Sequence, residues 1–223
     1  AKFLEQELEQ IKQRLGEERK VFMLVSGGVD STVAFALLNK ALGDKRVYGL
    51  FVDTGFLRKN EGQNVNKALR ALKFKNFHMV DAGKRFFNAL KGITDPEEKR
   101  KIIGDTFLEV QREEVKRLKL DPNHWLLGQG TIYPDTIETG GTKHAARIKT
   151  HHNRVPEVEA LMKRGLVIEP LKNLYKDEVR EVGAKLGLPK EMVWRHPFPG
   201  PGLAVRILCA KKSYPLPQKE KIE

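Results

Sequence analysis

The chain is poor in cysteine and has no long apolar run. Cys209 is the only cysteine among 223 residues, which excludes a disulfide framework and a cysteine-rich zinc site. A reducing compartment is the default for such a chain, and we expect a cytoplasmic protein. The longest clear apolar run, Val21–Val25, is far shorter than the roughly 20 residues of a membrane span, so we expect no membrane partner. The charged N-terminal segment lacks the apolar stretch of a secretory signal.

Negative charge is also scarce relative to positive charge. The 41 Lys and Arg residues outnumber the 29 Asp and Glu residues, which gives a formal net charge of +12. Such an excess favours a polyanionic partner, namely nucleic acid, an acidic surface or a phosphate-rich small molecule. A solvated basic surface explains the same charge equally well. The length suits one large domain, and the missing initiator Met and the tail-like segment 215–223 predict a fragment of a longer chain.

Short apolar runs alternate with amphipathic segments along the sequence. We expect strands at 21–25, 47–52, 76–80, 125–127 and 167–168, and helices at 3–15, 31–41, 61–72, 95–118 and 177–186. This alternation predicts an α/β fold with a doubly wound parallel sheet and helices on both faces. Residues 129–156 show little periodicity and many Gly, Thr and His residues, so we expect a long irregular, functional stretch.

One glycine-rich segment joins the first expected strand to the helix that follows. This segment, called the glycine loop below, consists of Ser26, Gly27, Gly28, Val29, Asp30, Ser31 and Thr32. Its glycines let the backbone approach a ligand, and its amides and hydroxyls can converge on phosphate oxygens at a helix N-terminus. Asp30 would repel a bare phosphate, so its natural role is to hold a Mg²⁺ ion that bridges the phosphates. The alternative is a plain glycine-rich turn without a ligand.

The glycine loop lacks the Lys of the common NTPase loop and instead resembles the PP-loop, Ser-Gly-Gly-x-Asp-Ser, of the N-type ATP pyrophosphatases. The resemblance implies a fold of the adenine nucleotide alpha hydrolase type. It also implies ATP and Mg²⁺ as cofactors. In that family, the loop grips the pyrophosphate that leaves when ATP adenylates an oxygen of the substrate.

Five further segments separate the PP-loop enzymes from one another, and all five resemble the GMP synthetases. They are residues 99–107, 128–138, 148–153, 195–206, and 169–172 taken with 176–180. The resemblance runs from about residue 20 to residue 209. It implies an ATP pyrophosphatase domain over residues 1–209, with 210–223 as a tail or the start of a missing C-terminal dimerisation domain.

The implied activity is the synthesis of GMP from XMP in two steps. The C2 oxygen of XMP attacks the α-phosphorus of ATP, and ammonia then displaces AMP. The implied ammonia source is a glutamine amidotransferase domain or subunit, which nothing in this sequence resembles. The resemblance also implies a homodimer when the C-terminal domain is present. We expect no nucleic-acid partner.

Several residues outside the glycine loop are candidates for the metal and phosphate chemistry. Asp135 follows an expected strand and can help Asp30 to hold Mg²⁺, or it can cap a turn after Pro134. Lys149 falls in a stretch that resembles the lid of the family, where a Lys can neutralise the leaving pyrophosphate. Asp30, Lys149 and Asp135 are therefore the expected catalytic residues.

The remaining candidates concern the two nucleotides. Asp53 ends the second expected strand, where adenosine would rest in a doubly wound sheet, and the backbones of Leu50 and Val52 are candidate adenine readers. The resemblance favours Arg100 as a contact for the XMP phosphate, although a surface helix with charge pairs explains it too. It places His151 and His152 in the XMP site.

Two other functions fit parts of the sequence. A PP-loop enzyme that modifies tRNA would suit the net charge of +12. However, the thiolating members use catalytic cysteines, and Cys209 is in the wrong place. The second alternative is a fragment that binds ATP but does not turn over without its partner domains.

Overall fold

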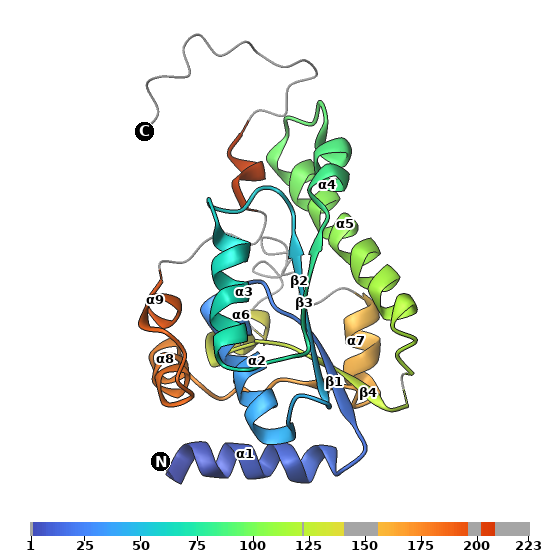
Figure 1. Cartoon of the computed structure of the whole chain (residues 1–223). Coiled ribbons are helices and arrows are strands. Elements are labelled where there is room, and N and C mark those ends of the chain that lie inside the picture. Colours follow the sequence, from blue (N-terminus) through green and yellow to red (C-terminus); the bar gives the residue numbers. More distant parts are fainter. Residues whose placement is uncertain (1, 122, 141–155, 196–201, 208–223) are drawn as a thin grey trace.

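The computed structural model describes residues 2–121, 123–140, 156–195 and 202–207 (Figure 1). A five-stranded sheet with the order β3-β2-β1-β4-β5 forms its centre, and every strand pair is parallel. The strands are β1 (Lys20–Leu24), β2 (Val47–Asp53), β3 (Phe77–Asp81), β4 (Trp125–Gly128) and β5 (Val167–Ile168). The five expected strands are confirmed, each to within one residue at either end.

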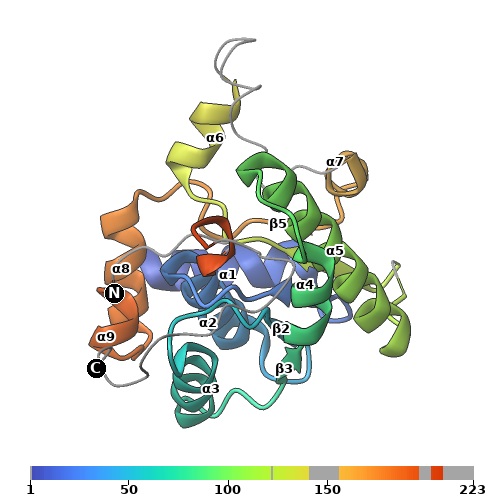
Figure 2. The same ribbon diagram turned by 90° about the horizontal axis from the view of Figure 1, so that it is seen from above.

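Helices cover both faces of this sheet. They are α1 (Lys2–Leu15), α2 (Val29–Leu42), α3 (Glu61–Ala71), α4 (Gly83–Leu90), α5 (Pro96–Arg117), α6 (Tyr133–Gly140), α7 (Pro156–Lys163), α8 (Lys176–Lys185) and α9 (Lys190–Val193), with a short 3-10 helix η2 (Gly202–Val205). Helices α1, α2, α3 and α8 lie on one side of the sheet, and α4 and α5 lie on the other (Figure 2). The predicted doubly wound arrangement is confirmed.

The strands are apolar throughout because the sheet is buried on both faces. Val21 and Met23 of β1 pack into the core under α2, whereas Phe22 between them packs into the core under α4 and α5. Successive side chains of a strand point to opposite faces, so a strand between two helical layers has no polar side. This is the reason that the sequence shows continuous apolar runs rather than alternation.

Helix α2, which continues from the glycine loop, is enclosed by protein on all sides. Its residues from Val33 to Leu38 are almost inaccessible to solvent, and it packs between the sheet and helices α1 and α8. A helix that is apolar on all sides is stable only when it is surrounded by protein. The glycine loop therefore leads into a rigid element.

The helices agree with the sequence-based expectation at α5 and differ from it at the short helices. Asp95, at the start of the helix expected over 95–118, caps α5, since its carboxylate accepts a hydrogen bond from the Glu98 amide at 2.8 Å. The prediction of an irregular stretch over 129–156 is wrong for residues 133–140, which form α6. Helix α4, whose buried Phe86 and Leu90 are spaced by one helical turn, was also not expected from the sequence, and neither were the short helices α7 and α9.

Within the described part of the chain, no helix is both long enough and apolar enough to cross a lipid bilayer.

Candidate functional site

The strand order reverses beside β1, and two loops leave the sheet at this point. The chain runs from β1 to β2 and β3 in one direction, whereas β4 and β5 lie on the other side of β1. Open α/β sheets bind ligands outside the carboxyl ends of the strands at such a point. The glycine loop, which follows β1, and the segment that follows β4 touch there, since a β-carbon on Gly130 would lie 2.9 Å from the backbone nitrogen of Ser31.

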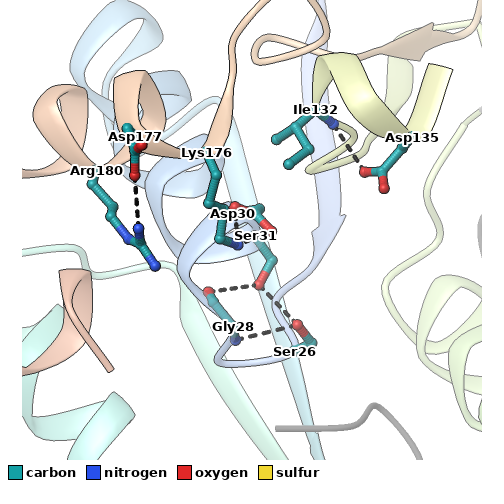
Figure 3. A network of polar contacts seen from close by, with 9 residues as sticks. All are labelled: Ser26, Gly28, Asp30, Ser31, Ile132, Asp135, Lys176, Asp177 and Arg180. Atoms are coloured by element: carbon teal, nitrogen blue, oxygen red, sulfur yellow. Dashed lines mark hydrogen bonds and ion pairs between the residues drawn. The ribbon is translucent and has the colours of Figure 1, made fainter. Parts of the chain in front are cut away.

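The glycine loop gathers two hydroxyls and a backbone amide at the start of α2 (Figure 3). The hydroxyl oxygens of Ser26 and Ser31 lie 2.9 Å apart, and the Gly28 amide donates to Ser26 Oγ at 3.3 Å. Ser31 Oγ also donates to the Gly28 carbonyl at 3.2 Å. Donors at a helix N-terminus are suited to an anion, so the geometry fits the phosphate cradle predicted for this loop. The other loop residues, Val29 and Thr32, are buried.

Asp30 forms an ion pair that the sequence analysis did not foresee. The Lys176 ammonium lies 2.6 Å from both carboxylate oxygens of Asp30 (Figure 3). Lys176 is the first residue of α8, and the Lys176 and Asp30 side chains are 36% and 27% exposed. The negative charge of the glycine loop is therefore balanced within the chain, and the pair remains open to solvent.

Asp135 is engaged at the start of α6. Its carboxylate accepts a hydrogen bond from the Ile132 amide at 3.1 Å, which is the turn-capping alternative considered for this residue (Figure 3). In the described residues, no three His, Cys, Asp or Glu side chains form a metal-binding cluster. Mg²⁺ is commonly held by one or two carboxylates together with phosphate oxygens and water, and the Asp30 and Asp135 side chains are ligands of that chemical type.

A cleft of about 210 Å³ opens beyond the carboxyl end of β2. It is called the β2 cleft below and is lined by Asp53, Gly55, Leu57, Arg58, Asn60, Glu61, Gly62 and Gln63. Asp53 Oδ1 accepts a hydrogen bond from the Gly55 amide at 2.8 Å. The Leu50 and Val52 side chains are buried, and the Leu50 carbonyl accepts a hydrogen bond from Val25 at 2.8 Å within the sheet. The cleft is polar and adjoins the glycine loop, because β1 and β2 are paired.

Arg195 connects the glycine loop to the β2 cleft. Its Nη1 donates to the Gly27 carbonyl at 2.6 Å, and its Nη2 is paired with the Glu61 carboxylate. The Arg195 and Glu61 side chains are 15% and 6% exposed. The sequence analysis assigned no role to either residue, although Arg195 opens the segment 195–206 that was already singled out.

The candidate residues for XMP are placed only in part. Arg100 lies on the exposed surface of α5 and is paired with Glu97, three residues earlier on the helix. Lys149, His151 and His152 lie outside the described residues. The structure therefore brings together the glycine loop, Asp30, Lys176, Arg195 and the β2 cleft, and leaves Arg100 on a surface helix.

Residues 20–195 match the family described as the phosphoadenosine phosphosulfate reductase domain. The chain belongs to this family. It is also 55% identical over 212 residues to a protein of Leptospira interrogans named probable GMP synthase (glutamine-hydrolyzing), covering 94% of this chain and 35% of that protein. A GMP synthase (glutamine-hydrolyzing) of Dictyostelium discoideum is 50% identical over 210 residues, covering 88% of this chain and 29% of that protein. The predicted resemblance to the GMP synthetases is confirmed, and the chain spans about a third of the length of these relatives.

Two solved structures share this fold. An NMN synthetase from Francisella tularensis has a TM-score of 0.61 at 15% identity, covering 89% of this chain and 77% of that one. An NH3-dependent NAD synthetase from Campylobacter jejuni has a TM-score of 0.61 at 14% identity, covering 88% and 78%. At this identity the comparison establishes the fold, and the predicted PP-loop type of α/β fold is confirmed.

Proposed function

We propose that this chain is the ATP pyrophosphatase part of a GMP synthase that uses glutamine as its ammonia source. In this proposal, residues 1–209 bind ATP and adenylate XMP at its C2 oxygen. The observation that carries the proposal is the hydroxyl and amide cradle of the glycine loop, built at the reversal of strand order in a chain related to GMP synthases. Residues 210–223 would be a tail or the start of a dimerisation domain.

The two halves of an ATP molecule have separate places in this proposal. The phosphates would bind at Ser26, Gly28 and Ser31, where a backbone amide and two hydroxyls lie at the N-terminus of α2. The adenosine would lie toward the β2 cleft, beside Asp53 and the end of the strand that contains Leu50 and Val52. The pairing of β1 with β2 supports this placement, since it puts both sites at the same edge of the sheet.

Charge neutralisation is the main task that we assign to the side chains around the phosphates. Asp30, with help from Asp135, would hold Mg²⁺, and the bound ion would supply positive charge to the phosphate oxygens. Lys176 would then exchange Asp30 for a phosphate oxygen, which its exposed position allows. Lys149 would act on the leaving pyrophosphate, and Arg100, His151 and His152 would contact XMP.

The reaction needs no covalent intermediate on the protein. In the first step, a bond forms between the XMP C2 oxygen and the α-phosphorus while the bond from that phosphorus to the bridging oxygen breaks, which releases pyrophosphate. In the second step, ammonia bonds to C2 and AMP leaves with the former C2 oxygen, which gives GMP after loss of a proton. Ser26 and Ser31 hydrogen bond to each other and serve to orient the phosphates.

The proposal is tested by following pyrophosphate release from ATP in the presence of XMP and Mg²⁺, with ammonium added afterwards and GMP measured by chromatography. We expect pyrophosphate release to require XMP, and GMP to form only after ammonium is added. If the chain alone forms GMP only slowly, the remaining two thirds of a relative would be added as a separate protein. Release that requires tRNA instead of XMP would favour the tRNA-modifying alternative, which the charge of +12 supports.

A further inference from the structure

Arg195 binds the carbonyl of one peptide group of the glycine loop, the Gly27–Gly28 peptide. Its guanidinium donates to the Gly27 carbonyl at 2.6 Å. The next amide along the chain, that of Gly28, donates to Ser26 Oγ (Figure 3). The C=O and N–H of one planar trans peptide point in opposite directions. A bond that fixes the Gly27 carbonyl therefore also fixes the direction of the Gly28 N–H.

We propose that Arg195 is a positioning residue that keeps the Gly27–Gly28 peptide turned so that its N–H faces the phosphates. This inference rests on the proposed function of the glycine loop as a pyrophosphate site. With the opposite orientation, the loop would present the Gly27 carbonyl oxygen to an anion and would lose a donor. Arg195 would thus act on ligand binding through the backbone, without touching the ligand itself.

The Gly27–Gly28 peptide needs such a restraint because glycine on both sides lets it rotate freely. Gly27 has φ +77°, a conformation that other residues rarely adopt, and Gly28 has φ −65°. A side chain at Gly27 would be strained by the positive φ, and its β-carbon would lie 3.1 Å from the Phe51 ring and 3.2 Å from Val65, so these neighbours would have to shift. Two hydrogen bonds therefore orient this peptide: the Arg195 guanidinium donates to the Gly27 carbonyl from outside the loop, and the Gly28 amide donates to Ser26 Oγ within it.

Glu61 keeps Arg195 in the orientation that this role requires. One oxygen of the Glu61 carboxylate is paired with Arg195, and the other accepts a hydrogen bond from the Arg58 amide at 3.0 Å. Glu61 also begins α3 and lines the β2 cleft. The buried pair thus links the phosphate half of the proposed site to the nucleoside half, and its fork geometry is one that Lys cannot reproduce.

The experiment compares Arg195→Lys with the wild type by calorimetry, using inorganic pyrophosphate and adenosine as separate probes, and by thermal unfolding. Lys keeps the charge beside Glu61 but cannot bond to both Glu61 and Gly27 in the same geometry. We expect at least a tenfold weaker affinity for pyrophosphate and less than a threefold change for adenosine. Arg85→Lys is the matched control, because Arg85 makes a two-pronged pair with Glu113 on the other face of the sheet. It should change neither affinity.

A second variant separates positioning from stability. Arg195→Gln combined with Glu61→Gln removes both charges, so that no unpaired charge remains buried, and it should also bind pyrophosphate at least tenfold more weakly. Unchanged pyrophosphate affinity in either folded variant would overturn the role of Arg195 alone. Equal losses for pyrophosphate and adenosine that follow the unfolding temperature would show a purely structural role and would overturn it too. A wild type that binds neither pyrophosphate nor ATP would overturn the proposed function together with this inference.

Discussion

The Lys176 ammonium lies 2.6 Å from both oxygens of the Asp30 carboxylate, although the two residues are 146 positions apart in the sequence. An ion pair that is partly exposed contributes only about 0–1 kcal/mol to stability, so a ligand can break it at little cost. Each partner then becomes available for a new contact. The negative charge of Asp30 and the positive charge of Lys176 can therefore be tested by separate substitutions.

Replacing Asp30 by Asn should abolish the Mg²⁺- and XMP-dependent release of pyrophosphate, because the amide cannot balance a divalent cation. The free energy of unfolding should change by no more than about 1 kcal/mol, since the lost ion pair is partly exposed. Asp177→Asn is the matched control, because Asp177 follows Lys176 on α8, pairs with Arg180 three residues further along that helix, and is 85% exposed. Pyrophosphate release at the wild-type rate by the Asp30 variant would contradict the assigned role.

Replacing Lys176 by Met should weaken ATP binding by about tenfold, which corresponds to about 1.4 kcal/mol. The variant leaves the Asp30 carboxylate unbalanced beside the phosphates and removes a cation from the site. The loss should shrink at high ionic strength, because salt screens charges that are open to solvent. Calorimetric titration with ATP measures this, and Lys185→Met in the last turn of the same helix should bind like the wild type. An equal affinity in both variants would argue against Lys176.

Replacing Gly130 by Ala should reduce ATP binding more than folding stability would account for. The new methyl group would lie 2.9 Å from the Ser31 backbone and 3.0 Å from that of Asp30, so the glycine loop must move. Overpacking of this kind costs about 1–3 kcal/mol. Gly49→Ala is the control, because its methyl group would clash with the Phe35 ring in the core rather than with the loop. The expected result is similar destabilisation in both variants and impaired ATP binding at Gly130 alone.

The sequence predicted the parts of this structure that depend on neighbouring residues. The strands are buried on both faces, so each is a visible apolar run, and the glycine loop has its hydroxyls and amides within seven positions. Lys176 and Arg195 reach the loop from 146 and 168 positions away, and no local pattern reports such a contact. Both residues lie at the edges of segments already singled out for resemblance. That resemblance was the signal in the sequence that drew attention to these two segments.

The short helices were missed for a different reason. Helices α4 and α6 each span only eight residues, and α6 lies inside the stretch 129–156 that was expected to be irregular, so neither offers the three or more turns over which periodicity becomes clear. The cap of α6 depends on the Asp135 side chain reaching back to Ile132. The residue was noticed in the sequence, but the choice between a cap and a metal ligand depends on side-chain direction.

The chain on its own should bind ATP and bind XMP much more weakly. The glycine loop and the β2 cleft are both present, whereas Arg100, exposed on α5 and paired with Glu97, is the one residue proposed to contact XMP within the described part of the chain. Each missing charge-assisted hydrogen bond weakens binding by about 1.5–3 kcal/mol. Arg100→Ala should remove the remaining XMP affinity and leave ATP affinity and stability unchanged within about 0.5 kcal/mol. Separate titrations measure this, and XMP binding as tight as ATP binding would show that the site is complete.

The stability of the fold should fall as the pH drops through the range of His78. Partial burial of the ring, which stacks on Tyr48 at 4.5 Å, lowers the pKa of His78 below 6.5; Arg117 and Arg70 lower this pKa further, and Glu114 opposes them. Because the unfolded chain takes up the proton first, the stabilisation is complete above pH 6.5 and is lost as the pH falls toward the pKa of the folded state.

His78→Phe should therefore show a smaller drop in unfolding temperature between about pH 7.5 and about pH 5.5 than the wild type does. Tyr48→Phe keeps a ring over His78 and should retain the drop. An identical pH dependence in the His78 variant and the wild type would mean that other groups cause it.

The central strand obtains its second neighbour late in the synthesis of the chain. Val21 of β1 pairs with Val47 of β2 soon after both are made, but its partner on the other side, Leu126 of β4, lies about a hundred residues downstream. At about 5–20 residues per second, a ribosome needs about 5–20 s to reach β4. During that interval one edge of β1 is an unpaired apolar strand, which is a template for aggregation. Pairing with β4 covers this edge once residues 125–128 have been made.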